Sequence, residues 1–149
     1  RGQRVLHQNI PVCGEVNLPG VQGRVLDLTV TIRPTGCEGY RWFRIHVARD
    51  DTHDIIIRYK PNESTLKIDR TRSGLPHDIV HTRSFLVRPQ NGALKLRIIL
   101  DRFSVEVFVN DGEQAASSVI YTRQEADAIT FEADGQALID VEKYDLMVE

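Results

Sequence analysis

The sequence predicts an all-β fold, an antiparallel two-sheet β-sandwich of the lectin-like jelly-roll type. Turn signals rich in Gly, Pro, Asn and Asp recur at short intervals, from Leu18-Pro19-Gly20 to Asp134-Gly135. Between them lie strand-length segments that alternate polar and apolar residues or are rich in β-branched and aromatic residues. Helical character is limited to one turn near residues 123–126. Short strands at this spacing favour an antiparallel sandwich or barrel.

The turn signals divide the chain into strands, each of which ends where Gly, Pro, Asn or Asp interrupts the pattern. The chain has 149 residues and no linker or break in composition, so a single domain over residues 1–149 is expected. In chain order, the expected strands lie near residues 24–33, 40–48, 54–60, 64–69, 78–87, 94–100, 104–109, 114–121, 127–133 and 137–147.

The clearest pair of strands lies within residues 94–112. Four apolar residues alternate along 94–100 and three valines alternate along 104–109, so each strand has one apolar face. Asn110-Asp111-Gly112 is a strong hairpin signal, because these residues tolerate positive φ. The second face of 104–109 carries Glu106 beside Phe108. A carboxylate beside an aromatic residue predicts either an ion pair or a surface that meets a partner.

Charge and hydropathy exclude two classes of partner. A net charge of −2 and a pI near 6.2 give no positive field for nucleic acid or for an anionic membrane. No apolar run has the length of a membrane span, and no signal peptide opens the chain. The first residue is Arg1, so we expect a fragment or a processed product, whose compartment the sequence does not assign.

The metal-ligating residue types do not form a recognisable site. Cys13 and Cys37 are too few for a disulfide framework or a complete zinc site. They could form one disulfide bridge or remain two free thiols, and free thiols are the preferred alternative. His77 and His81 have the spacing of a helical zinc motif, but Ile79 favours a strand, on which the histidines would lie ~13 Å apart. No metal and no cofactor is therefore expected.

An acidic segment separates two apolar segments near residue 50. It contains Asp50, Asp51, His53 and Asp54. A calcium loop usually has a glycine at its sharp turn, and this segment has none. A solvated turn is the expected structure.

Aromatic residues offer two interpretations. Tyr40, Trp42, Phe43 and Tyr59 could stack on sugar rings, because their rings have an apolar face and some carry a polar group. They fit a sandwich core equally well, and the core is the preferred interpretation because aromatic side chains are routinely buried.

Catalysis by this chain is not expected. Asp101 and Glu106 could in principle form the carboxylate pair of a glycosidase, which needs two carboxylates across the scissile bond and one raised pKa. The sequence contains no nucleophile elbow and no phosphate-binding glycine loop. The catalytic assignment is therefore none.

One short pattern occurs twice. Asp69-Arg70 and Asp101-Arg102 each follow an apolar strand directly. The simpler interpretation is two similar strand ends, with a turn-forming Asp and an Arg in a surface ion pair. The alternative is two corners that line one shared polar site.

These segments together resemble the C-terminal β-sandwich of glycoside hydrolase family 32, which includes invertases, levanases, inulinases and sucrose-6-phosphate hydrolases. The resemblance covers most of residues 40–147, and the run from Asp101 to Phe108 is its most specific part. The matching segments are Leu96-Arg97-Ile98, Asp101 to Gly112, Leu66 to Gly74, Val119-Ile120-Tyr121 and Ile129-Thr130-Phe131.

The catalytic motifs of that family are not in this chain. Family members carry them in a five-bladed β-propeller that precedes the sandwich: an Asp nucleophile in Asn-Asp-Pro, an Asp in Arg-Asp-Pro and a Glu followed by Cys. Here Gly112 follows Asn110-Asp111, and Cys37 precedes Glu38. The last strand also carries Tyr144-Asp145-Leu146 where a Trp is frequent. No catalytic residue is carried over from the family.

The resemblance implies a longer enzyme that hydrolyses terminal β-D-fructofuranosides with retention, through a covalent intermediate formed in its propeller. The expected partners are that N-terminal propeller domain and, as in some members, a second copy in a homo-oligomer. The alternative function is a module that binds fructose-containing carbohydrate. A standalone enzyme is a third hypothesis. Candidate interdomain or sugar-binding residues are Asp69, Arg70, Asp101, Arg102, Glu106 and Phe108, with Glu106 expected to pair with Arg70 or Arg102.

Overall fold

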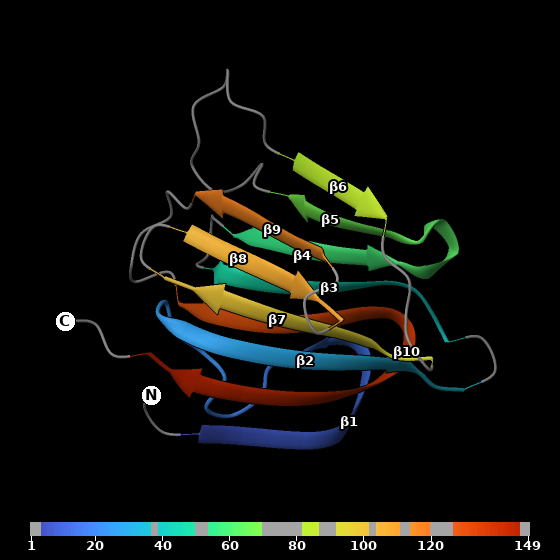
Figure 1. Cartoon of the computed structure of the whole chain (residues 1–149). Coiled ribbons are helices and arrows are strands. Elements are labelled where there is room, and N and C mark those ends of the chain that lie inside the picture. The colour runs from blue at the N-terminus through green and yellow to red at the C-terminus, as the bar shows by residue number, and fades with distance from the viewer. Residues whose placement is uncertain are drawn as a thin grey trace.

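The computed structural model describes residues 4–36, 39–49, 54–69, 82–86, 92–101, 104–110, 114–119 and 127–146. Within these residues the protein consists of antiparallel strands and one short 3-10 helix, η1, which confirms the predicted all-β sandwich class (Figure 1). The strands are β1 (Arg4–Val16), β2 (Leu26–Pro34), β3 (Tyr40–Arg49), β4 (Ile55–Lys60), β5 (Thr65–Asp69), β6 (Thr82–Leu86), β7 (Leu94–Leu100), β8 (Ser104–Val109), β9 (Gln114–Val119) and β10 (Ala128–Asp145); η1 spans Pro61–Glu63. No helix among the described residues is both long and apolar enough to cross a membrane.

The two layers of the sandwich are parts of one continuous sheet. Its order is β6-β5-β4-β3-β10-β2-β7-β8-β9, and β1 pairs with β10. The first part of β10 pairs with β3, and the part after Gly135 pairs with β2. We call the layer from β6 to the first part of β10 layer A, and the layer from the second part of β10 to β9 layer B. In Figure 1 the orange part of β10 lies behind and the red part returns in front of it.

Strand β1 follows the same path as β10. Its first residues, from Arg4 to Val12, pair with the second part of β10, and Gly14 to Val16 pair with the first part. The register shifts between Val12 and Gly14, where the strand changes layers. Among the described residues each layer therefore contains six strands, and two of them, β1 and β10, continue from one layer into the other.

The bend in β10 is possible because residue 135 is a glycine. Gly135 has a φ of 131°, and a Cβ at this position would collide with the carbonyl oxygen of Gly39 and lie 2.7 Å from the Cα of Tyr40. Two hydrogen bonds fasten the bend: the Gln136 N–H donates to the Gly39 oxygen at 2.8 Å, and the Thr35 N–H donates to the Gln136 oxygen at 3.2 Å. Both layers thus meet at one tightly packed corner.

The core lies between the layers and follows the alternation of each strand. In β7 and β8 the apolar residues are buried and the intervening residues are more exposed, as the sequence predicts. Branched and aromatic side chains from both layers form one hydrophobic core. Its largest fully buried members are Tyr59, Phe43, Phe131, Leu26, Leu28, Ile32, Ile45, Ile55, Ile57, Leu66, Ile68 and Leu94.

The aromatic residues divide between the core and the surface. Tyr40, Phe43 and Tyr59 are buried and pack edge to face, which confirms the core interpretation for these three. Burial raises the pKa of the Tyr40 hydroxyl far above its usual range. Trp42 is half-buried on the outer side of β3, with the Arg44 guanidinium 4.0 Å from its ring centre.

Eight predicted strands correspond to β2–β9, although only residues 82–86 of the predicted 78–87 segment are among those described. Two predictions were wrong. Segments 127–133 and 137–147 are one bent strand, because the peptide after Gly135 remains paired through the turn. Strand β1 was not predicted, because its bulges near Asn9 and Gly14 interrupt the alternation of polar and apolar residues. The helical turn predicted near 123–126 lies outside the described residues.

We predict that Gly135→Ala destabilises the fold by about 4 kcal/mol, because backbone strain and steric overlap each contribute roughly 1–3 kcal/mol. Gly14→Ala is the matched control: Gly14 also has positive φ, but a Cβ there would meet nothing within 4 Å. It should cost only about 1–2 kcal/mol. Urea denaturation of both variants measures the difference, and equal losses would show that the corner at Gly39 does not require close approach.

Candidate functional site

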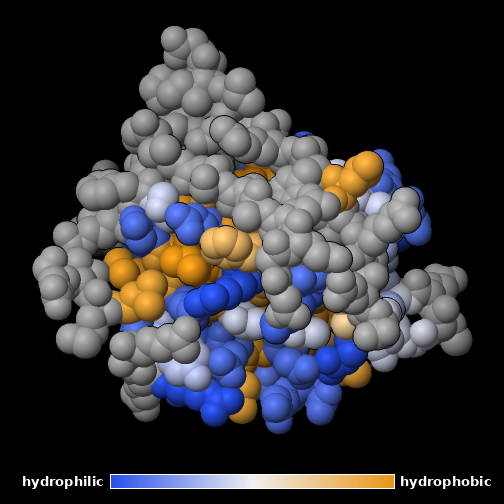
Figure 2. All heavy atoms as spheres, viewed as in Figure 1, coloured by the Kyte–Doolittle hydropathy of each residue, from blue (hydrophilic) through white to orange (hydrophobic). Residues whose placement is uncertain are grey.

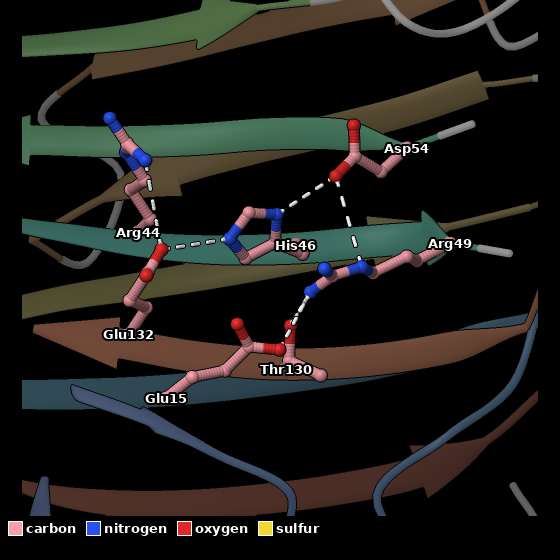
Figure 3. Close-up of polar contacts among 7 residues, drawn as sticks. All are labelled: Glu15, Arg44, His46, Arg49, Asp54, Thr130 and Glu132. Carbon is pink, nitrogen blue, oxygen red and sulfur yellow. Dashed lines mark hydrogen bonds and ion pairs between the residues drawn. The ribbon is translucent and has the colours of Figure 1, made fainter. Parts of the chain in front are cut away.

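Polar side chains gather on both outer faces of the sandwich. Each strand directs alternate residues away from the core, so each layer presents the polar half of its sequence outward. On layer A these residues form a compact network around His46, which we call the His46 cluster: Glu15, Arg44, His46, Arg49, Asp54, Thr130 and Glu132 (Figure 3). On layer B they surround a hollow.

The centre of the His46 cluster is an imidazole between two carboxylates. His46 Nδ1 lies 2.9 Å from Asp54 Oδ2, and Nε2 lies 3.3 Å from Glu132 Oε1. His46 is 5% exposed and Asp54 is 1% exposed, although both lie on the side of β3 and β4 away from the core. Ionised carboxylates only accept hydrogen bonds, so both contacts are hydrogen bonds only when both ring nitrogens carry a proton.

Two arginines complete the network. Arg49 Nη1 donates to Thr130 Oγ1 at 2.6 Å and to Glu15 Oε1 at 3.0 Å, and its Nε lies 3.9 Å from Asp54 Oδ2. Arg44 Nη1 lies 3.7 Å from Glu132 Oε1. The Thr130 hydroxyl is thus bonded to an arginine and not to the imidazole, so these residues lack the nucleophile-to-base hydrogen bond of a catalytic triad.

A bulge in β3 brings Arg49 to this face. Strict alternation would turn Ala48 outward with His46 and turn Arg49 inward. Ala48 instead has a φ of 49°, and the pairing with β10 shifts between His46 and Arg49. The extra residue restores Arg49 to the outer side, where it meets Asp54. The bulge therefore supplies a cation to a buried carboxylate.

The hollow on layer B has a volume of about 690 Å³ and extends over β1, β10, β2, β7 and β8. Thr29 and Thr31 line it from β2, in the middle of these strands, and Phe108 lines it from β8. In Figure 2 hydrophilic residues gather over β1, β10 and β2 on this face, and a smaller hydrophobic area adjoins them over β7 and β8. The remaining lining residues are Arg4, Leu6, Gln8, Asp27, Lys95, Arg97, Asp140, Val141, Glu142 and Tyr144.

Ion pairs between neighbouring strands hold the lining of the hollow in place. Arg97 donates to both oxygens of Asp27, at 3.0 and 2.7 Å, and Asp27 is only 5% exposed. Arg4 donates to Glu142 at 2.8 Å. The lining contains three cations and three carboxylates, so its formal charges cancel. The lining of the hollow is therefore neutral overall, and its ion pairs hold the charged side chains in fixed positions.

Asp140, which also lines the hollow, accepts hydrogen bonds from two directions. Arg33 Nη1 donates to its Oδ2 at 2.7 Å, and the Asn9 N–H donates to its Oδ1 at 2.8 Å. The bond from Arg33, assisted by that from Asn9, lowers the pKa of the Asp140 carboxyl. A carboxyl held in its ionised form is unsuited to act as a general acid.

The structure separates the predicted site residues. Glu106 and Phe108 share the outer face of β8, and Asp101 is exposed at the β7–β8 turn, where its N–H donates to the Ser104 oxygen at 2.9 Å. Asp69 lies on layer A instead, where it pairs with Ile56 of β4. It is therefore on the other layer from Glu106 and Phe108. Arg70 and Arg102 lie outside the described residues, so their pairing with Glu106 stays a prediction, as does a site shared by the two Asp-Arg corners.

The acidic-turn prediction was wrong for Asp54, which is 1% exposed because its carboxylate faces His46 and Arg49 of the neighbouring strand β3. Asp50, Asp51 and His53 lie outside the described residues, as do Cys37, His77 and His81. Cys13 is an exposed free thiol. Over the described part of the chain, no group of three or more His, Cys, Asp or Glu residues is placed to hold a metal ion.

The sequence reasoning missed most of the residues that form the two polar surfaces, Phe108 of the hollow and Asp54 of the His46 cluster excepted. His46 occupies a polar position in the strand 40–48, and Asp54 begins the following strand, so a hairpin between the two strands could have suggested their contact. Asp27 and Arg97 likewise interrupt apolar strands. A carboxylate in the middle of an apolar strand is a signal for a cation on a neighbouring strand, but the sequence does not say which strand is the neighbour.

Comparisons with known proteins identify relatives along nearly the whole chain. The profile described as glycosyl hydrolases family 32 C terminal matches residues 2–146. The chain is 34% identical to a sucrose-6-phosphate hydrolase of Staphylococcus xylosus over 109 residues, which are 70% of this chain and 21% of that protein. It is 29% identical to a levanase of a Bacillus species, strain L7, over 127 residues, covering 82% of this chain and 14% of that protein.

Solved structures share the fold at lower sequence identity. An exo-inulinase from Aspergillus awamori superimposes with a TM-score of 0.81 at 19% identity, over 97% of this chain and 29% of that one. A sucrose-6-phosphate hydrolase from Lactobacillus gasseri superimposes with a TM-score of 0.76 at 20% identity, over 99% and 28%. The chain therefore spans less than a third of each of these relatives.

We predict that His46→Ala destabilises the protein by about 3 kcal/mol, because it removes the imidazole that lies 2.9 Å from the buried Asp54 carboxylate. The control is His7→Ala. His7 is half-buried and its Nε2 lies 2.8 Å from the Pro19 oxygen, so its loss should cost about 1 kcal/mol. Chemical denaturation at pH 7 compares the two, and a smaller loss for His46→Ala would show that the cluster is not an energetic unit.

Asp140→Asn should lower the free energy of unfolding at pH 7 by about 1 kcal/mol, since solvent screens this partly exposed pair with Arg33. The folded pKa of Asp140 lies below its ordinary value of 3.8, so the stabilisation is present above pH 3.8 and is lost as the pH falls through the folded pKa. Denaturation curves of both proteins from about pH 6 to pH 2 should converge at the acid end. A difference that persists at pH 2 would contradict this assignment.

Proposed function

The chain belongs to the family of glycosyl hydrolase family 32 C-terminal domains, and from this premise we propose that it is the non-catalytic β-sandwich module of a longer fructosidase. In that protein a catalytic β-propeller would precede it. The module would support the propeller by packing against it, and could also contribute to a homo-oligomer.

The observation that carries this proposal is the extent of the match. The family profile covers residues 2–146, yet the chain corresponds to only 21% and 14% of the two hydrolases described above. Most of the length of each relative has no counterpart here. Catalysis is therefore assigned to that remainder, and the sandwich takes a supporting role.

The chemistry of the described carboxylates supports the same division. Retaining glycosidases need two carboxyl groups on either side of the scissile bond, one of which must be protonated at the working pH. Asp27, Asp140 and Glu142 are all engaged with arginines on the outer face of layer B. For Asp140, the hydrogen bond from Arg33 lowers the pKa of the carboxyl, which disfavours a general-acid role and favours a structural one.

The proposed substrates of the longer protein are terminal β-D-fructofuranosides, namely sucrose, sucrose 6-phosphate or a fructan. The names of the relatives, a sucrose-6-phosphate hydrolase and a levanase, support this class. The choice among the three would be made by residues of the propeller.

Binding of fructose-containing carbohydrate is the second candidate function. The hollow on layer B favours it, since threonine hydroxyls, balanced charges and the ring of Phe108 form a lining suited to a neutral ligand with many hydroxyl groups. Of the four expected residues that the structure describes, Asp69, Asp101, Glu106 and Phe108, only Phe108 lines the hollow.

The proposal predicts that this chain alone releases no fructose from sucrose, sucrose 6-phosphate, inulin or levan, because the catalytic carboxylates lie in the propeller. The full-length protein that carries this segment should hydrolyse at least one of the four. Reducing-sugar release measures both, with the full-length protein as the positive control. Turnover by the chain alone would refute the non-catalytic assignment and support the standalone enzyme.

A further inference from the structure

A row of three positively charged residues crosses the outer face of layer A. Arg44 of β3 is in register with Arg58 of β4, and Arg58 is in register with Lys67 of β5. Each points outward, because the residues on either side of it in its strand are buried in the core. We call these three residues the cationic row. Like charges directly opposite each other on neighbouring strands destabilise a sheet, so the row favours a compensating anion.

The described part of the protein does not neutralise this row. Neither Arg58 nor Lys67 forms an ion pair or a side-chain hydrogen bond with any described residue. Arg44 Nη1 lies 3.7 Å from Glu132 Oε1, which is longer than a hydrogen bond, and Arg44 Nε is buried without a hydrogen-bond partner. The cationic row therefore contains N–H donors that have no acceptor among the described residues.

Other arginines in the described chain have close carboxylate partners. Five of them lie 2.7–3.0 Å from a carboxylate oxygen, namely Arg4, Arg33, Arg41, Arg49 and Arg97. The cationic row departs from this pattern, although it lies in regular, well-paired strands. A local departure from the rules that stabilise the rest of a fold is typical of a functional surface.

Trp42 holds one end of the cationic row in place. The Arg44 guanidinium lies 4.0 Å from the centre of the Trp42 ring, close enough for a cation–π interaction. Figure 3 shows Arg44 reaching from β3 over β4, the strand that carries Arg58. An arginine that is already positioned loses less conformational freedom when it binds an anion.

The surroundings of the cationic row limit the size of its ligand. On β10, Glu132 is in register with Arg44, so a carboxylate ends the row on that side. Lys60, the next outward residue of β4, is already paired with Glu63 at 3.5 Å. Asp69, the next outward residue of β5, places another carboxylate beyond the row. A long polyanion binds along an extended track of cations, so this short row suits a small anion.

We propose that the cationic row binds a phosphate dianion, either as inorganic phosphate or as the phosphate group of a sugar monoester. A phosphate group carries a charge of about −1.5 to −2 at pH 7 and has three acceptor oxygens. Arg44 and Arg58 offer paired N–H donors for these oxygens, and Lys67 adds a point charge. Opposite Cβ atoms on neighbouring strands lie about 5 Å apart, so the three long side chains can converge on one group. The site is on the other layer from the hollow and is separate from the function proposed above.

Amide chemical shifts test the proposal, because each amide reports on binding near its own position. The isotopically labelled chain is titrated at pH 7.5 with inorganic phosphate and, separately, with glucose 6-phosphate, at an ionic strength kept constant with sodium chloride. The amides of Arg44, Arg58 and Lys67 should shift most and should saturate together, with a Kd on the order of 1 mM. Tighter binding of glucose 6-phosphate would support a sugar phosphate as the ligand, and equal binding would support inorganic phosphate.

Three variants provide a matched comparison. Arg58→Gln removes the central charge of the row and should weaken phosphate binding at least tenfold, whereas Arg58→Lys keeps the charge and should stay within threefold of the parent chain. Arg41→Gln makes the same change in charge at an arginine that is 80% exposed and paired with Asp134, and it should change the Kd less than twofold. Arg58→Gln should be at least as stable to urea as the parent chain, because it relieves repulsion between like charges.

Three other results would each overturn the proposal. Shifts that sodium chloride alone reproduces would show general screening of charge and no site. Shifts centred on Thr29 and Thr31 would place the anion in the hollow of layer B. Equal weakening by Arg58→Gln and Arg41→Gln would show an effect of net charge and not of the row. None of these results depends on the hydrolysis assay, so the phosphate site and the proposed function can fail separately.

Discussion

The bend of β10 at Gly135 is the constraint on which the rest of the structure depends. One strand pairs with β3 before this residue and with β2 after it, so a single sheet becomes two facing layers. The corner is closed by backbone contact with Gly39 and Tyr40, which leaves no space for a side chain at position 135. Because β1 follows β10 through the same turn, the closed edge of the sandwich and the start of the chain are placed by this one corner.

Folding one sheet in this way gives the molecule two outer faces that both carry charged residues but are covered to different extents. On both faces the charged residues come from alternating positions, and ion pairs join residues of neighbouring strands. The β3 bulge at Ala48 brings one more cation to layer A, where the side chains close over His46. On layer B the threonines of β2 are too short to fill the space between the ion pairs, and the hollow remains.

The sequence predicted most strands because alternation is a local property. Residues 94–100 and 104–109 form strands with the predicted bounds, and their apolar faces are buried as expected. Strand β1 was missed, because Asn9 and Gly14 interrupt its pattern and its pairing partners in β10 lie more than a hundred positions away in the sequence. For the candidate site, Glu106 and Phe108 were predicted on one face, but Asp27 and Arg97 were not singled out, since they lie on strands distant in the sequence. His46 was not singled out either, since its contact with Asp54 depends on the pairing of β3 with β4.

The sequence by itself determined the all-β class, the positions of eight strands and, through the run from Asp101 to Gly112, the resemblance to the family that the comparisons establish. These follow from short-range patterns of side-chain polarity and turn residues, which are read within a few residues. The tertiary structure alone decided that two segments form one bent strand, that Asp54 is buried against His46 and that the hollow lies on layer B. The reason is physical: each depends on which strands become neighbours, and that choice is made by packing across the whole chain.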